Sequence, residues 1–362
     1  MDVLRVENVG SLLRPPALLE ARERFAAGEL SAAALARVED AAVDDAVALQ
    51  EACGIDVVTD GELRRNVFAS GLAQSVDGFD RVEGNTVDWF RLDGTRDTSP
   101  VTVAVTSRLR RRRSLLTEEL AYLRARTHRP IKATIPAPSM YAYYWLPGVS
   151  EAAYPTPWAY LEDVTALLRE EAEEAVRQGC DYLQIDAPEL GMLIDPHQRA
   201  WFEAKGFDPD RLVREGVDMI DAVVEGLPVR TGLHLCRGND ANRFMARGGY
   251  GAIAADVFPR TACQILLLEY DDDRSGGFEP LDLVPDDRVV VLGLVTTKRA
   301  ELEQPERLRE RISQAAEHVP LERLALSTQC GFASVAKGNH LSPEAQEAKL
   351  RLVASVAASV WG

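Results

Sequence analysis

The sequence of 362 residues predicts an α/β fold, a (β/α)8 TIM barrel with a β insertion after strand two. Eight short apolar runs alternate with longer segments of helical periodicity, which is typical of repeated βα units. Between residues 71 and 113 the helical period disappears, and Gly-Asn and Asp-Gly pairs separate stretches of alternating polar and apolar residues. We therefore interpret residues 1–362 as one catalytic barrel with a β-rich insertion at 71–113.

The elements follow in chain order. The predicted strands cover residues 5–9, 55–59, 131–136, 182–186, 231–236, 264–270, 288–295 and 324–327. The predicted helices cover residues 17–51, 158–178, 211–224 and 343–359. The first of these breaks near Gly28, and Ser31 is expected to cap its second half. Since no Gly-x-Gly-x-x-Gly turn follows the first strand, the competing topology, a doubly wound open sheet, is disfavoured.

Composition narrows the class of protein. With 57 Asp and Glu against 41 Lys and Arg, the net charge of −16 argues against a nucleic-acid or anionic-membrane partner. Four consecutive arginines at 110–113 are expected to form a solvated face or a subunit contact, which leaves a homo-oligomer open. No secretory signal is evident and no apolar run approaches the ~18 residues of a spanning helix, so we expect a cytoplasmic protein. Five widely spaced cysteines argue against a disulfide framework.

Soft-metal ligand types gather at strand ends. His234 and Cys236 are two residues apart on a predicted strand, so their side chains are expected to point to one face. In a barrel the C-terminal strand ends converge, and strands six and eight add Glu269 and Cys330. An imidazole, two thiolates and a carboxylate form a ligand set for Zn²⁺. The other three cysteines are expected to be structural; these are Cys53, Cys180 and Cys263.

Several motifs in register resemble a known family. They are Val9-Gly10-Ser11, Asp60-Gly61-Glu62, residues 184–189, His234-Leu235-Cys236, Leu268-Glu269 and Gln329-Cys330-Gly331. Their order and spacing resemble those of the catalytic barrel of cobalamin-independent methionine synthase, in its single-barrel form. The resemblance implies zinc on the residues matching His234, Cys236, Glu269 and Cys330. It also implies that Ser11, Glu62 and Asp186 hold the amino-acid part of homocysteine.

The residue chemistry agrees with this resemblance. Zinc would hold a thiol substrate as its nucleophilic thiolate, and Glu269 would be the most exchangeable ligand. The Glu62 and Asp186 carboxylates suit a substrate ammonium, although each could instead cap a helix. Arg14 suits a substrate carboxylate or sulfonate, and the aromatic loop at 140–145 is expected either to line a pocket or to form a lid on the barrel. The predicted substrate-binding set is Val9, Gly10, Ser11, Arg14, Glu62, Asp186, Tyr143 and Trp145.

One position departs from the family pattern. In methionine synthase the loop after strand seven carries an Asp-x-His pair whose His is the general acid towards the pterin, whereas Lys298 stands near that place here. A lysine is a poorer proton donor at neutral pH. The predicted catalytic residues are therefore Glu62, Asp186 and Lys298, with the alkyl donor left open among folate, a corrinoid, another methylated compound and an epoxide.

The predicted function is zinc-dependent alkylation of a small thiol. Methyl transfer to homocysteine, giving methionine, ranks first because carboxylates surround the expected substrate tail. An epoxyalkane:coenzyme M transferase is the alternative enzyme. A barrel that holds zinc or a thiol without turnover is the alternative of another class. The expected partners are a small thiol and an alkyl donor.

Overall fold

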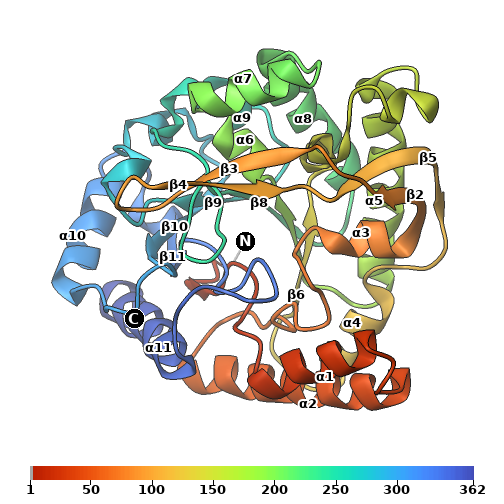
Figure 1. Ribbon diagram of the computed structural model, residues 1–362. Coiled ribbons are helices and arrows are strands. Elements are labelled where there is room, and N and C mark those ends of the chain that lie inside the picture. The colour runs from red at the N-terminus through yellow and green to blue at the C-terminus, as the bar shows by residue number, and fades with distance from the viewer. Residues whose placement is uncertain (1–2) are drawn as a thin grey trace.

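The computed structural model describes residues 3–362 and shows a curled parallel sheet enclosed by helices (Figure 1). Seven strands are hydrogen-bonded in the order β1-β11-β10-β9-β8-β7-β6, with each neighbouring pair parallel. They are β1 (Val6–Glu7), β6 (Lys132–Pro136), β7 (Tyr182–Asp186), β8 (Arg230–Leu235), β9 (Ile265–Glu269), β10 (Val289–Val295) and β11 (Leu324–Thr328). These match seven of the eight predicted strands, with ends that differ by at most two residues.

The eighth position of the barrel is filled by a very short segment. Val57 forms one parallel bridge with Glu7 of β1, and Val58 forms one with Ile131 beside β6. These two bridges join the edge strands of the sheet, so the prediction of a barrel is confirmed and the open doubly wound sheet is excluded. The strand predicted over residues 55–59 is wrong in length, because only the two bridges form.

Side chains explain why this strand is so short. The Asp56 carboxylate accepts the backbone N–H groups of Arg5 and Val6 at 2.7 and 3.0 Å. On the other side, Gln50 Oε1 accepts the backbone N–H of Thr59 at 3.0 Å. Backbone groups that are already paired with side chains do not extend a ladder. The chain therefore leaves the sheet immediately before and after the two bridging residues.

A buried ion pair spans the same gap inside the barrel. Lys132 Nζ of β6 lies 2.6 Å from Glu7 Oε2 of β1 and donates to the carbonyl of Asn8 at 2.7 Å. The Lys132 and Glu7 side chains are 0% and 1% exposed, so each charge is stabilised by the other and not by water. The pair links the two strands that flank the weak eighth position.

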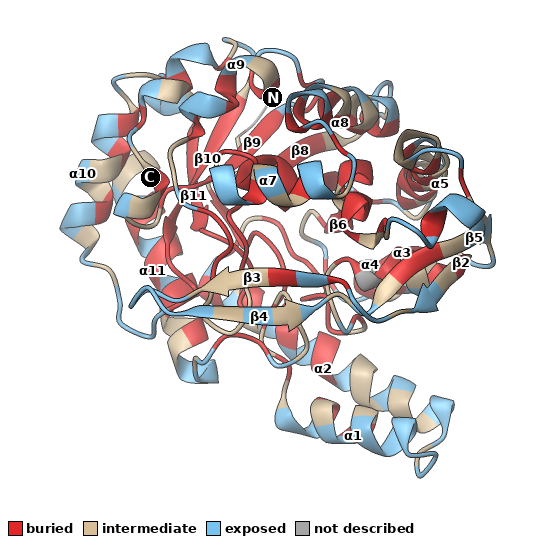
Figure 2. Ribbon diagram, turned by 45° about the horizontal axis from the view of Figure 1, so that its top comes forward, coloured by how far each residue is buried: buried red, intermediate tan, exposed pale blue. Residues whose placement is uncertain are grey.

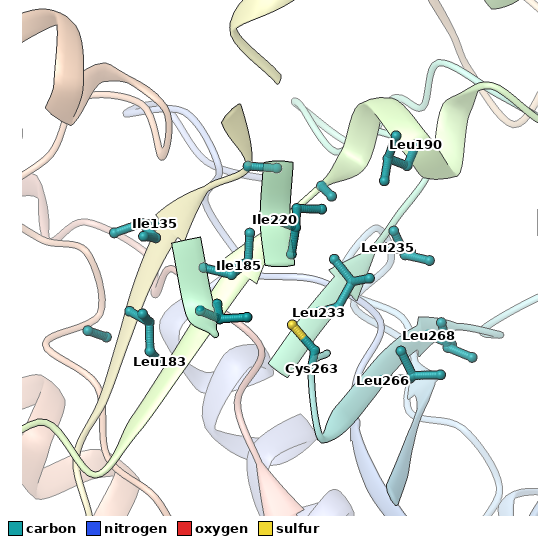
Figure 3. Packing of buried hydrophobic residues seen from close by; sticks show 14 of the residues in the cluster. Ile135, Leu183, Ile185, Leu190, Ile220, Leu233, Leu235, Cys263, Leu266 and Leu268 are labelled. Atoms are coloured by element: carbon teal, nitrogen blue, oxygen red, sulfur yellow. The ribbon is translucent and has the colours of Figure 1, made fainter. Parts of the chain in front are cut away.

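Alternate strand residues face two different cores. Outward side chains of β7, β8 and β9 pack beneath the helices; Figure 3 shows Leu183, Ile185, Leu233, Leu235, Leu266 and Leu268 there with Ile220 of α8 (Pro209–Val224). A smaller apolar cluster includes Val9, Val57, Tyr182, Ile265, Leu267, Val289, Val291 and Ala325. The alternation of β7, β8 and β9 places Asp186, His234 and Glu269 on the same side as Tyr182 and Leu267. These three polar groups therefore lie inside the barrel, at the C-terminal ends of their strands.

The other helices surround the sheet. They are α1 (Pro16–Ala26), α2 (Ala32–Cys53), α4 (Thr117–Arg124), α5 (Pro157–Arg177), α6 (Pro188–Met192), α7 (Pro196–Ala204), α9 (Ala254–Val257), α10 (Pro305–Ala315) and α11 (Pro343–Trp361). Ser31 caps α2, as predicted, since its Oγ accepts the N–H of Ala34 at 3.2 Å. Within residues 3–362, no helix combines the length and the apolarity that a bilayer crossing requires.

The predicted β insertion is present and lies across one end of the barrel (Figures 1 and 2). It contains α3 (Ser70–Ser75) and two antiparallel pairs, β2 (Val76–Arg81) with β5 (Val103–Arg111) and β3 (Thr86–Phe90) with β4 (Arg96–Pro100). Phe90 of β3 exchanges backbone hydrogen bonds with Phe244, at 2.7 and 3.0 Å. The arginine run at 110–113 is largely ion-paired: Arg110 and Arg112 contact Asp77, and Arg111 contacts Glu170 and Glu171.

Replacing Lys132 tests how much the free energy of unfolding depends on the buried pair. Lys132→Met leaves the Glu7 carboxylate buried without its cation, so we expect the free energy of unfolding to fall by about 3–5 kcal/mol. Urea denaturation at neutral pH measures the loss. The double variant Lys132→Met/Glu7→Leu removes both charges and should recover most of it. A single variant that loses no more stability than the double variant would contradict a role for the pair in closing the barrel.

Candidate functional site

Three predicted metal ligands meet at the end of the barrel. Among the described residues, the ligand atoms of His234, Cys236 and Cys330 all lie within 4.8 Å of one another, and all three side chains are buried. His234 comes from β8, Cys236 directly follows that strand, and Cys330 follows β11. One imidazole and two thiols in this arrangement fit a tetrahedral zinc ion, which takes Cys and His ligands.

The surroundings orient the first two ligands. The carbonyl of Leu267 on the next strand lies 3.3 Å from His234 Nδ1, while His234 Nε2 is buried with no hydrogen-bond partner among residues 3–362. A backbone partner on one ring nitrogen leaves the other free for a metal. Gly191 of α6 lies directly against Cys236, because a Cβ there would come within 2.3 Å of the Cys236 carbonyl oxygen. Only glycine permits this close approach.

The two thiols are not equivalent. The interaction with Cys236 lowers the pKa of Cys330 well below its ordinary value, and the same interaction raises the pKa of Cys236 well above it. One thiolate is therefore favoured in the free protein. Burial lowers the pKa of His234, but neighbouring Cys330 and the carboxylates outweigh burial and raise it. A bound metal cation would stabilise both thiolates, so neither sulfur would need to keep a proton.

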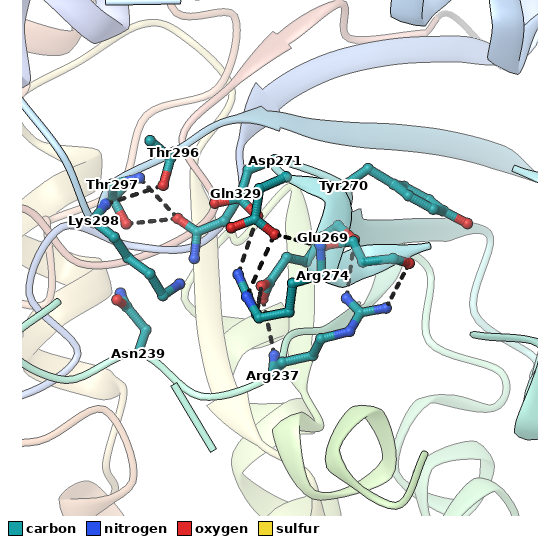
Figure 4. Close-up of polar contacts among 12 residues, drawn as sticks. Arg237, Asn239, Glu269, Tyr270, Asp271, Arg274, Thr296, Thr297, Lys298 and Gln329 are labelled. Atoms are coloured by element: carbon teal, nitrogen blue, oxygen red, sulfur yellow. Dashed lines mark hydrogen bonds and ion pairs between the residues drawn. The ribbon is translucent and has the colours of Figure 1, made fainter. Parts of the chain in front are cut away.

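The fourth predicted ligand, Glu269, is engaged elsewhere. Its Oε1 lies 2.7 Å from Arg274 Nη1, and its Oε2 accepts the backbone N–H of Arg237 at 2.9 Å (Figure 4). Arg274 belongs to the 3-10 helix η4 (Asp273–Ser275) just after β9. Burial raises the pKa of Glu269, but Lys298, Arg274 and Arg237 together lower it to about 2. Glu269 is thus an ionised carboxylate beside the cluster of three ligands, held by arginine.

Lys298 also lies in this network of charges. It is 2% exposed, and its Nζ has no hydrogen-bond partner in the described part of the chain. Among the cations around Glu269, Lys298 favours the ionised carboxylate most strongly, and its charge also lowers the pKa of Cys330. Figure 4 shows Lys298 near Asn239 and Gln329. Lys298 is absent from the residues that line the cavity described below.

Glu62 sits in a strained turn that brings it to the site. Its backbone φ of 55° is left-handed, a conformation that costs a residue with a side chain about 1–2 kcal/mol. The turn is held by the Asp60 carboxylate, which accepts the N–H of Glu62 at 2.8 Å. Thr134 donates to Glu62 Oε1 at 2.9 Å, whereas Oε2 is buried with no hydrogen-bond partner within residues 3–362. This orphaned oxygen is a candidate contact for a bound cation.

The Ser11 loop packs against the Cys330 loop. A Cβ at Gly331 would come within 2.5 Å of Ser11 Oγ, so glycine is required for the contact. Phe332 donates its N–H to the Ser11 carbonyl at 2.7 Å, and Ala333 donates to Ser11 Oγ at 3.2 Å. Strand ends that are more than 300 residues apart in sequence are thereby fixed together at the site.

Asp186, at the end of β7, is a further polar group of the site. Gln184 Nε2 donates to Asp186 Oδ1 at 2.7 Å, and Asp186 is 7% exposed. Burial raises the pKa of Asp186 to about 7, with Glu62 contributing in the same direction and His234 opposing it. A cationic group placed between Asp186 and Glu62 would favour the ionised form of both.

A cavity of about 560 Å³ opens onto these residues. It is lined by His234, Cys236 and Cys330 and by predicted substrate-site residues, namely Val9, Gly10, Ser11, Glu62, Asp186 and Tyr143. Tyr143 belongs to the 3-10 helix η1 (Pro138–Tyr144), which forms the aromatic segment predicted as a loop.

Two predicted substrate-site residues do not reach the cavity. The Arg14 guanidinium is directed to backbone carbonyls, including those of Glu62 and Arg65 at 3.1 and 3.0 Å, and therefore ties loops together. Trp145 is buried with its ring 6.2 Å from that of Tyr160. In this structure neither side chain lines the cavity, which is lined by the other six members of the predicted set.

Other lining residues were missed from the sequence. They come mainly from the insertion: Phe79, Val87, Trp89, Val101 and Val103. Met140 and Tyr144 of η1 also line the cavity, in line with the expectation that the segment 140–145 could line a pocket. The alternation of residues 87–92 was a signal for a strand with one apolar face, but it did not show what that face covers. Arg274 was also missed, because it directly follows an acidic run, Asp271-Asp272-Asp273, that is typical of a solvated turn.

Comparison with known proteins agrees with these observations. The family described as "Cobalamin-independent synthase, Catalytic domain" matches residues 5–358. The uncharacterized protein YxjH of Bacillus subtilis (strain 168) is 36% identical over 365 residues, covering 99% of this chain and 94% of that protein. A 5-methyltetrahydropteroyltriglutamate–homocysteine methyltransferase of Mycolicibacterium paratuberculosis is 24% identical over 341 residues, covering 91% of this chain but 40% of that enzyme.

Solved structures show the same fold. A structural-genomics target from Listeria monocytogenes superposes with a TM-score of 0.74 at 27% identity, covering 99% of this chain and 98% of that one. A B12-independent methionine synthase from Shewanella sp. W3-18-1 gives a TM-score of 0.77 at 21% identity, with the same coverage.

The ion pair of Glu269 with Arg274 predicts a measurable effect on metal binding. Arg274→Met should free the Glu269 carboxylate to join the three ligands, so zinc should bind about tenfold more tightly, while the metal-free chain becomes less stable. Competition with a chromophoric chelator measures the zinc affinity. Arg274→Lys keeps the cation and serves as the matched control. Equal zinc affinity in the Met variant and the native chain would show that Arg274 does not compete with zinc for Glu269.

Proposed function

Because the chain belongs to the family of cobalamin-independent synthase catalytic domains, we propose that it is a zinc-dependent S-methyltransferase that acts on homocysteine and forms methionine. The observation that carries the proposal is the buried group of His234, Cys236 and Cys330 at the floor of a cavity that has room for a small thiol and a donor. Since thiols stay reduced in the cytoplasm, this is the compartment we propose.

The proposed metal site has three protein ligands and one exchangeable position. His234, Cys236 and Cys330 would hold zinc, and Glu269 would be the fourth ligand when it leaves Arg274. Zinc bound there would supply a Lewis acid that keeps a thiol deprotonated at neutral pH, which makes its sulfur a nucleophile. Arg274 offers the Glu269 carboxylate an alternative partner at 2.7 Å, so that giving way to a thiol does not leave it unpaired.

The amino-acid end of the acceptor has matching groups in the cavity. The free oxygen of Glu62 and the Asp186 carboxyl are both buried in the lining and would bind the ammonium group. Ser11 lies in the same lining, on the loop that contacts the Cys330 loop. Coenzyme M carries a sulfonate and no ammonium, so it offers the Glu62 and Asp186 carboxyl groups no cationic partner. Homocysteine is therefore the better fit.

The first experiment measures zinc per chain and its sulfur neighbours. We expect about one zinc per chain, and X-ray absorption at the zinc edge should show one additional sulfur neighbour after homocysteine is added, but not after coenzyme M. Cys330→Ala should lose both zinc and methyl transfer, whereas Cys263→Ala, a buried cysteine outside the group, should keep both. A fully active Cys330→Ala protein without zinc would overturn the proposal. Zinc that never gains a sulfur neighbour would favour a non-catalytic metal site.

Glu62→Gln tests the acceptor's amino group. Loss of the carboxylate charge should weaken homocysteine binding by about tenfold, because a hydrogen bond to a charged group contributes about 1.5–3 kcal/mol, while zinc is retained. Titration calorimetry on the zinc-loaded protein measures the affinity. Glu83→Gln changes the same side chain at an exposed position outside the cavity lining and serves as the control. If both variants bind homocysteine like the native chain, the ammonium lies elsewhere.

A further inference from the structure

Glu62 is held by a side chain that lies outside the cavity. Thr134 of β6 donates its hydroxyl to Glu62 Oε1 at 2.9 Å, whereas Glu62 Oε2 has no hydrogen-bond partner within residues 3–362. Glu62 lines the cavity, but Thr134 is absent from the described lining. One carboxylate oxygen is therefore occupied by the protein, and the other remains for a group bound in the cavity.

The direction of the hydrogen bond from Thr134 is fixed by an arginine. Arg65 Nη1 donates to Thr134 Oγ1 at 3.1 Å and to the Thr134 carbonyl at 2.9 Å. A guanidinium has only donors, and a threonine hydroxyl has a single proton. Because the hydroxyl oxygen accepts from Arg65, its own proton is directed to Glu62 Oε1.

Arg65 is itself fixed on two sides. Its Nε and Nη2 donate to the two carboxylate oxygens of Glu119 in α4, at 3.1 and 2.7 Å, which is a bidentate ion pair. Its backbone carbonyl accepts from Arg14 Nη2 and from Arg22 Nη1, both at 3.0 Å. Arg65 is 3% exposed and Glu119 is 7% exposed. The guanidinium therefore has one position from which to reach Thr134.

The arginine contacts Glu62 without neutralising it directly. Burial lowers the pKa of Arg65, but Glu119 and then Glu62 outweigh burial and raise it above its ordinary value, so the guanidinium stays charged. In the described part of the chain its ion pair is with Glu119, and the Thr134 hydroxyl lies between Arg65 and Glu62. A direct ion pair would use the carboxylate that a substrate ammonium needs. The intervening hydroxyl orients Glu62 and leaves Oε2 without a cation.

We propose that Thr134 and Arg65 are positioning residues for the ammonium group of the thiol substrate, because they hold Glu62 so that its Oε2 meets that group. This rests on the proposed function, in which Glu62 binds the ammonium. The thiol end of the substrate would lie at His234, Cys236 and Cys330 and does not depend on these contacts. Loss of the contacts should weaken thiols that carry an ammonium and spare thiols that lack one.

The test measures the Kd of two thiols on the zinc-loaded full chain by titration calorimetry. Homocysteine carries the ammonium, whereas 4-mercaptobutanoate has the same thiol, carbon chain and carboxylate without it. Thr134→Val removes the hydroxyl at nearly constant volume and should raise the Kd of homocysteine about threefold to tenfold, with that of 4-mercaptobutanoate unchanged. Thr134→Ser keeps the hydroxyl and should bind both thiols like the native chain. An equal loss for both thiols in Thr134→Val, or no loss for homocysteine, would overturn the positioning role.

Two further variants test the arginine and the specificity of the change. Arg65→Lys keeps a cation beside Glu119 but loses the planar fork that reaches Thr134, so homocysteine alone should bind more weakly. Native affinity in this variant would overturn the role of the guanidinium. Thr165→Val removes a hydroxyl that donates to the Leu161 carbonyl within α5, outside the cavity lining, and should leave both Kd values unchanged.

A double variant tests whether Thr134 acts through Glu62. In a chain that already carries Glu62→Gln, the further change Thr134→Val should alter the Kd of homocysteine little, because both changes remove the same contact with the ammonium. A loss that adds fully to that of Glu62→Gln would show that Thr134 acts elsewhere and would overturn the proposal.

The native chain separates failure of the positioning role from failure of the proposed function. It should bind homocysteine more tightly than 4-mercaptobutanoate, since only homocysteine offers an ammonium to Glu62 and Asp186. If the native chain binds the two thiols equally, or binds neither, the proposed homocysteine site fails and the positioning role fails with it. If the native chain prefers homocysteine and Thr134→Val keeps the full preference, only the positioning role fails.

Discussion

Closure of the parallel sheet is the constraint on which the site depends. The three candidate metal ligands come from β8 and from the end of β11, and they meet because the strands curl around one axis. Yet the barrel closes through only two backbone bridges, at Val57 and Val58. The buried Lys132–Glu7 pair spans this weak position from within. A buried pair is a poor source of net stability, but its loss leaves a charge without a partner, so it specifies the closed arrangement strongly.

Charge balance is a second constraint, and it acts among the buried charged side chains beside the three candidate metal ligands. Glu269, Asp271, Arg274 and Lys298 are buried together, and none of them is stable there unless its neighbours keep their charges. A divalent ion at the adjacent His and Cys residues would change that balance at once. If zinc bound there, the cationic side chains would compete with it for the Glu269 carboxylate, so the fourth position would stay exchangeable. Structural zinc sites, by contrast, are closed by four firm ligands.

The sequence was informative wherever one periodicity decided the outcome. Strand parity placed His234 and Cys236 on one face, and the rule that strand ends converge placed Cys330 beside them. The sequence was uninformative where the orientation of a side chain depends on contacts among several loops. The orientation of Glu269 depends on Arg274 in a turn, and Arg14 was drawn away by four carbonyl groups that no motif reveals. Trp145 and Tyr143 are neighbours in an aromatic run, yet only the second reaches the cavity. Side-chain direction in such a segment follows from packing, not from composition.

The cavity is lined from two sides, by strand ends of the barrel and by the insertion. In the proposed reaction, activation of the thiol would rely on the strand-end residues, which are fixed by the fold and by contacts such as that of Gly331 with Ser11. The insertion lines the rest of the cavity, and backbone and side-chain hydrogen bonds attach it to the barrel. Substitutions on β2 to β5 can therefore change the lining of the cavity without disturbing the three candidate metal ligands. Loops vary more readily than the strands that carry them, so the thiol half of the reaction is expected to be the common property of such barrels and the donor half the variable one.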